Sequence, residues 1–160
     1  MIENTCCFIG NRKITETKEL REQLYKTVED LIVEKKADTF LLGSKSRFND
    51  LSREIVNELK EKYPHIKRIF VRAEFPYINN SYKKHLLENY EDTYFPEKAI
   101  GANRAVFVKR NYEMIDKSRF CVIYYDSQNA PTTRRSGAKI ALDYAMKRNK
   151  TVIKFPNLKM

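Results

Sequence analysis

Glycine is scarce in this chain, which holds four glycines in 160 residues, about a third of the usual frequency of roughly 7%. Glycine is normally needed where the backbone turns left-handed or approaches a ligand closely. In so glycine-poor a chain, the positions that glycine does occupy are therefore informative. They are Gly10, Gly43, Gly101 and Gly137.

Cysteine and long apolar runs are also scarce. Of the three cysteines, Cys6 and Cys7 are adjacent and have no CxxC partner, which is a poor disulfide or metal framework. No apolar run approaches the roughly 18 residues of a membrane span, and the N-terminal segment lacks the basic and apolar regions of a secretory signal. These absences predict a cytoplasmic protein with reduced thiols, without a metal, a cofactor or a membrane partner.

The remaining composition is that of a globular protein, with 42% hydrophobic and 32% charged residues. The length is that of one domain, and we expect a single domain over residues 1–160.

The charge is unevenly distributed along the chain. Residues 1–97 hold 17 basic and 17 acidic residues, whereas residues 98–160 hold 14 basic and 4 acidic residues, so the C-terminal part carries the whole net charge of +10. This asymmetry favours an anionic partner there, although solvated lysines that only keep the protein soluble would give the same count.

Short apolar runs alternate with helical periodicity along the chain. The pattern predicts an α/β fold with an open, mainly parallel sheet of about five strands and helices on both faces. Residues 74–103 are expected to form a long irregular but ordered excursion. The expected strands are 4–10, 39–43, 67–73, 119–126 and 151–155, and the expected helices are 17–36, one around 51–59, a short one near 81–90, 103–116, and one capped by Ser136.

Three of the glycines map to one edge of this predicted sheet. Gly10 and Gly43 each end a strand, and Gly137 opens a helix after another strand. Ligands of open parallel sheets bind beyond the carboxyl ends of the strands, where the strand order switches. The polar groups near these glycines suit an anion such as a phosphate. They are Asn11, Arg12, Ser44, Lys45, Arg134, Arg135, Ser136 and Lys139.

Five segments, taken in order, resemble a known family. CCFIGNR, GSKSRFND, FVKRNYEMID, RFCVIYYD and SGAKIALDYAMKRNKTVI are similar to segments of the SLOG superfamily, specifically its small stand-alone YpsA-like members. SLOG unites DNA-processing protein A with the lonely-guy phosphoribohydrolases. The resemblance covers nearly the whole chain and implies a Rossmann-like domain that binds a nucleotide or a nucleotide-derived ligand at the edge described above.

The resemblance also implies roles for individual residues. It places Gly10 and Arg12 in a first phosphate-facing turn and Ser136 and Gly137 in a helix-capping turn. The second loop would contain Gly43, Phe48 and Asp50, and a helix signature would contain Arg110, Asn111 and Asp116. The chain departs from the family where Asn11 replaces the usual histidine, where GSKSRF replaces a small GGA-type loop, and where Ala138 replaces a common threonine.

Three functions fit these features. The favoured one is binding of a small phosphorylated nucleotide-type ligand, with Tyr125 among its stacking surfaces. The second is hydrolysis of a nucleotide N-glycosidic bond with Glu74 or Asp126 as the acid, and the third, less favoured, is binding of single-stranded nucleic acid. Homo-oligomerisation is left open. The candidate ligand-binding residues are Gly10, Asn11, Arg12, Gly43, Ser44, Phe48, Asp50, Arg110, Asn111, Tyr125, Ser136, Gly137 and Lys139.

The segment CCFIGNR carries a specific hypothesis. Gly10 would let the chain turn sharply off the first strand, and Arg12 would meet an anion across that turn. The competing interpretation makes Arg12 a structural residue that pairs with Asp116 or Asp126.

Overall fold

A computed structural model describes residues 2–43, 45–127 and 136–156. The strands in these residues form a six-stranded sheet in the order β4-β3-β2-β1-β5-β6, and every neighbouring pair is parallel. The predicted α/β class is confirmed, with one strand more than expected. The strands are β1 (Thr5–Gly10), β2 (Thr39–Leu42), β3 (Lys67–Val71), β4 (Asp92–Tyr94), β5 (Phe120–Tyr124) and β6 (Thr151–Phe155).

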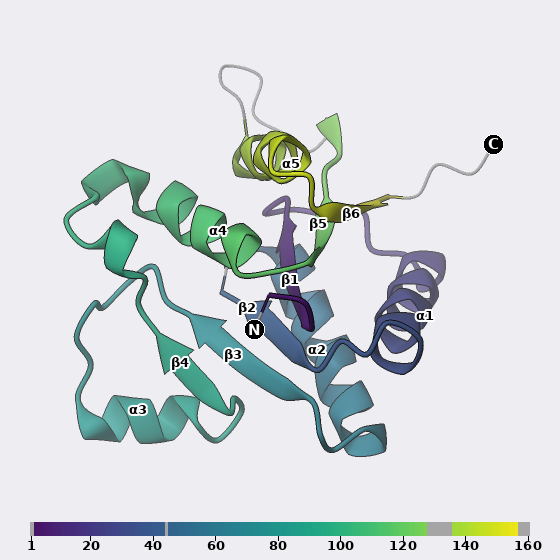
Figure 1. Ribbon diagram of the computed structural model, residues 1–160, viewed down its shortest axis with the longest axis horizontal. Helices are drawn as coiled ribbons and strands as arrows, with labels where there is room; N and C mark the ends of the chain where they lie inside the picture. Colours follow the sequence, from purple (N-terminus) through teal and green to yellow (C-terminus); the bar gives the residue numbers. More distant parts are fainter. Residues whose placement is uncertain (1, 44, 128–135, 157–160) are drawn as a thin grey trace.

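Helices cover both faces of the sheet (Figure 1). α1 and α2 pack on one face, and α4 and α5 pack on the other. α3 lies beside β4, away from the central strands (Figure 1). The helices are α1 (Lys18–Val33), α2 (Arg47–Lys62), α3 (Asn80–Leu86), α4 (Val106–Asp116) and α5 (Gly137–Lys147), with 3₁₀ turns η1 (Glu97–Ala99) and η2 (Asn103–Ala105) before α4.

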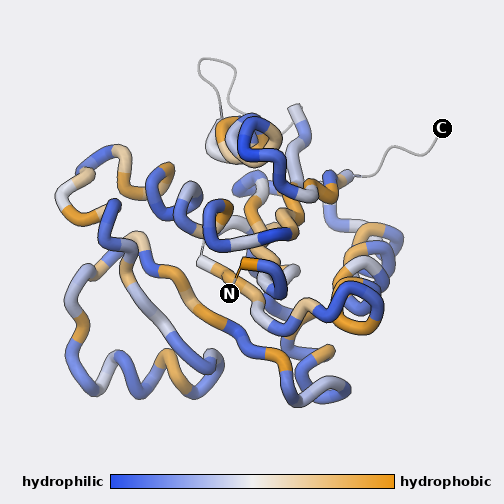
Figure 2. The backbone as a smooth tube through the Cα atoms, viewed as in Figure 1, coloured by the Kyte–Doolittle hydropathy of each residue, from blue (hydrophilic) through white to orange (hydrophobic). Residues whose placement is uncertain are grey.

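The central strands are apolar on both faces because both faces are covered. In β1, Cys6 and Phe8 face the α1–α2 layer, whereas Cys7 and Ile9 face the α4–α5 layer. Figure 2 shows this concentration of hydrophobic residues along the central strands, with hydrophilic residues on the outer helix faces. Cys6, Cys7 and Cys121 are free and buried, so the expected reduced thiols are part of the core.

The sixth strand lies within residues 74–103, which the sequence presents as irregular. β4 is only Asp92–Tyr94, with no apolar run to reveal it, and it forms by pairing with the end of β3. Further along, the predicted helix 103–116 is a 3₁₀ turn followed by α4. The excursion therefore adds an edge strand and leads the chain back to the carboxyl edge of the sheet, where α4 begins.

The strand order switches between β1 and β5. β2, β3 and β4 extend the sheet on one side of β1, and β5 and β6 extend it on the other. The loops that follow β1 and β5 therefore leave the sheet in opposite directions and open a crevice between them. Within the described ranges, no helix combines the length and apolarity needed to cross a membrane.

Candidate ligand site at the carboxyl edge

The loop after β1 is fastened to the end of β5. The backbone N–H of Asn11 donates to the carbonyl of Tyr124 at 3.1 Å, and its side-chain Nδ2 donates to the carbonyl of Asp126 at 2.8 Å. Asn11 is 5% exposed, and its Oδ1 is buried without a hydrogen-bond partner. A buried unpaired acceptor is costly, so the switch point retains an unused polar group.

Arg12 is held through its backbone and free at its side chain. Its carbonyl accepts a hydrogen bond from the N–H of Arg47 at 2.9 Å. The exposed guanidinium makes no hydrogen bond or ion pair with any described residue. Asp116, one carboxylate that the competing interpretation needs, instead accepts from Tyr144 Oη at 2.9 Å and pairs with Lys98. The geometry therefore presents Arg12 to solvent beside the switch point.

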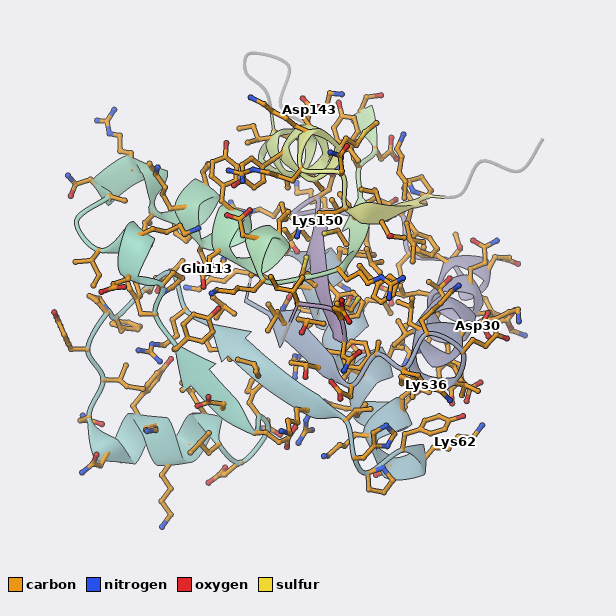
Figure 3. All side chains as sticks on the ribbon, viewed as in Figure 1. Asp30, Lys36, Lys62, Glu113, Asp143 and Lys150 are labelled. Carbon is orange, nitrogen blue, oxygen red and sulfur yellow. The ribbon has the colours of Figure 1, made fainter. Side chains whose placement is uncertain are left out.

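The N-terminus of α5 lies on the β5 side of the crevice. Ser136 caps the helix, with its Oγ accepting from the N–H of Lys139 at 3.1 Å. Lys139 Nζ lies 5.7 Å from the centre of the Tyr125 ring and forms an ion pair with Asp143 at 3.1 Å. Figure 3 labels Asp143 on α5. Gly137 is exposed and has open space where a side chain would begin.

The glycines that end β1 and β2 are required by packing, which corrects the expectation that Gly10 provides a sharp turn. Among the described glycines only Gly101 has a positive φ. A Cβ on Gly10 would lie 2.5 Å from the side chain of Phe48, and a Cβ on Gly43 would collide with the carbonyl oxygen of Val71. Both glycines therefore permit a close approach of chain segments beneath the edge.

Arg110 reaches from α4 to the ends of β2 and β3. Its Nη1 donates to the carbonyl of Gly43 at 2.6 Å and lies 3.4 Å from the carbonyl of Val71, and its Nε donates to Asn111 Oδ1 at 2.9 Å. Arg110 is 3% exposed, and burial lowers its pKa to about 10 although the nearby Glu74 carboxylate opposes the shift. No described carboxylate forms an ion pair with it. A buried guanidinium without a carboxylate partner is stabilised when a ligand brings a further hydrogen-bond acceptor to it.

A pocket of about 100 Å³ opens beside Arg110, beyond the ends of β2 and β3. Its polar lining includes Lys45 and Glu74, which form an exposed ion pair at 2.7 Å. Arg72 is also in the lining, and burial lowers its pKa. The remaining lining residues are Gly43, Phe70, Ala73, Phe75, Tyr82 and Phe107.

The structure gathers the predicted residues into two adjacent groups. Gly10, Asn11, Arg12, Tyr125, Ser136, Gly137 and Lys139 lie around the switch point, whereas Gly43 and Arg110 lie at the ends of β2 and β3. Ser44, Arg134 and Arg135 lie outside the described residues.

Three further candidates do not line the pocket beside Arg110. Phe48 is fully buried and packs against Tyr124 with ring centres 5.4 Å apart, so it supports Gly10 and offers no exposed ring. Asn111 is 9% exposed and orients Arg110. Asp50 is half-buried in the first turn of α2.

The two proposed acids lie in different pockets. Glu74 is part of the pocket beside Arg110. Asp126 contributes to a second cavity of about 320 Å³ at the start of α1, together with Thr15, Glu19 and Tyr124. The two acids therefore do not meet in one pocket.

Comparison with known proteins assigns the chain to a family. A family model described as the YspA SLOG family, YpsA, matches residues 6–158. The chain belongs to the YspA SLOG family. No curated protein matches the chain. SLOG membership agrees with the resemblance found in the sequence and with nucleotide-related binding or processing in general.

Sequence reasoning missed the walls of the pocket in this SLOG fold. Arg72 directly follows β3, and a charged residue after an apolar strand is a usable signal of the carboxyl edge. Phe107 is 48% exposed near the start of α4. Phe75 and Tyr82 come from the excursion, whose path only the structure provides.

Proposed function

We propose that this SLOG protein binds a nucleotide or a nucleotide-derived phosphorylated ligand at the carboxyl edge of its sheet. The observation that carries the proposal is Arg12, an exposed guanidinium without a described partner on a loop that is fixed by backbone hydrogen bonds. Because the Arg12 backbone is already fixed, binding a phosphate has to order only the side chain, whose guanidinium offers two parallel donors.

Neighbouring groups support a phosphate at this position. The N-terminus of α5, capped by Ser136 and open at Gly137, carries partial positive charge. Lys139 and the half-buried ring of Tyr125 flank the same crevice. A cation, a helix N-terminus and an aromatic surface together suit a phosphorylated nucleotide.

Thermal shift with AMP, ADP, GMP, GDP and ADP-ribose tests the proposal, beside a salt titration with a fluorescent oligo-dT strand. A nucleotide present at about 100 times its dissociation constant is expected to stabilise the fold by roughly 2.7 kcal/mol. Stabilisation by at least one nucleotide, with oligo-dT binding lost at physiological salt, is the expected result. Submicromolar oligo-dT binding at physiological salt without any nucleotide effect would overturn the proposal in favour of a nucleic-acid function.

A further inference from the structure

We propose that the pocket at the ends of β2 and β3 holds the base of the bound nucleotide, and that it selects guanine. This inference rests on the proposed function and adds the identity of the base. It places the phosphate near Arg12 and the base beside Arg110, along the same carboxyl edge.

The walls of the pocket suit a planar aromatic group. Four of its ten lining residues are aromatic: Phe70, Phe75, Tyr82 and Phe107. Stacking on such side chains is worth about 1–3 kcal/mol per base. The volume of about 100 Å³ is below the roughly 300–1,000 Å³ of sites that enclose a whole ligand, so the pocket fits one part of a nucleotide.

The turn that carries Phe75, a lining residue of the pocket, is fixed by hydrogen bonds within the protein. Phe75 has a left-handed φ of 58°, a strained conformation for a bulky residue. Arg72 holds this turn, since its Nε donates to the carbonyl of Phe75 at 3.2 Å and its Nη1 donates to Thr93 Oγ1 at 3.0 Å. Strained residues that are fixed by their surroundings are frequent at ligand clamps.

Residues of the pocket lining also carry hydrogen-bond donors that have no described partner. Arg110 Nη2 donates to no described residue, and neither do the backbone N–H groups of Ala73 and Glu74. A ligand with an acceptor-rich edge therefore suits them. Guanine provides O6 and N7, the acceptor pair that arginine recognises in nucleic acids.

The carboxylate of Glu74 discriminates between the purines. It accepts hydrogen bonds from N1–H and N2–H₂ of guanine. Adenine places the acceptor N1 where guanine has a donor, so the same carboxylate would disfavour it. The exposed ion pair of Glu74 with Lys45 is worth about 0–1 kcal/mol, so exchanging it for guanine costs little.

Calorimetric titration with GMP, IMP and AMP tests this inference on the wild-type protein. GMP is expected to bind roughly tenfold to a hundredfold more tightly than AMP. IMP lacks only the N2 amine, so it should fall between them. Glu74→Gln should weaken GMP binding roughly tenfold or more while leaving AMP binding nearly unchanged.

Phe107→Ala should weaken the binding of GMP, IMP and AMP, whereas Tyr77→Ala should weaken the binding of none of them. Tyr77 is the control because it is an 84% exposed aromatic residue, two positions after Phe75 in the excursion, and it does not line the pocket. Equal binding of GMP and AMP, or a loss that is the same for Phe107→Ala and Tyr77→Ala, would overturn the inference and leave the proposed function standing. Absence of binding for every nucleotide would overturn both.

Discussion

At the scale of single residues, the edge of the sheet depends on how closely side chains approach the backbone. Gly43 leaves room for the carbonyl oxygen of Val71 and for the side chain of Arg110. Arg110 Nη1 itself lies 3.4 Å from that oxygen. Gly137, by contrast, borders open space. Two glycines at the same edge therefore tolerate a methyl group very differently.

Gly43→Ala is expected to destabilise the fold by about 1–3 kcal/mol, because the new methyl group collides with a backbone carbonyl that cannot swing aside. Gly137→Ala is the matched control and should change stability by less than about 0.5 kcal/mol. Urea denaturation of both variants measures the two effects. Equal stability of the two variants would contradict the packing role assigned to Gly43.

At the scale of elements, an ion pair supplements the backbone pairing of β3 with β4. It joins Arg68 of β3 to Glu91, the residue just before β4. Arg68 Nη2 and Nε donate to the Glu91 carboxylate at 2.8 Å and 3.1 Å, and the backbone N–H of Arg68 donates to it at 2.7 Å. Burial alone would raise the pKa of the Glu91 carboxyl, but the bonds and charge of Arg68 outweigh it, so the pKa is lowered.

Glu91→Gln is therefore expected to cost about 1 kcal/mol of stability at neutral pH. A carboxyl with a lowered folded-state pKa stabilises the fold above its unfolded pKa, and this contribution disappears as the pH falls through the folded value. Urea denaturation of wild type and variant at pH 7 and at pH 3 should show the difference shrinking in acid. An undiminished difference at pH 3 would show that the charge of Glu91 is not responsible.

The sequence predicted elements where one periodicity dominates. α1 follows from the spacing of Leu20, Leu24 and Val28, and all three are buried. β4 could not be predicted because three residues without an apolar run pair only once β3 is in place.

For the site, the sequence predicted the edge of the sheet but not the contacts that shape it. The convergence of the strand ends followed from the alternation of strands and helices. The reach of Arg110 to Gly43 and the packing of Phe48 over Gly10 depend on contacts between residues far apart in sequence, which no local pattern contains.

At the scale of the whole molecule, we predict that residues 1–160 form one cooperative domain around the sheet. Limited proteolysis is expected to cut first within 127–135, a polar sequence that lies largely outside the described residues. The cut chain should stay associated, because β6 pairs with β5 along five residues. Two fragments that separate and fold independently would contradict a single domain.

The central claim is that the carboxyl edge binds a phosphorylated nucleotide through Arg12. Melting temperature and GMP affinity measured on the same Arg12→Ala sample test it most directly, with Lys13→Ala as the control because Lys13 is the neighbouring exposed cation. A lost charge-assisted hydrogen bond should weaken binding roughly tenfold to a hundredfold, with stability changed by less than about 0.5 kcal/mol, and Lys13→Ala should bind nearly as wild type does. An Arg12→Ala protein that melts several degrees lower yet binds GMP normally when folded would contradict the account.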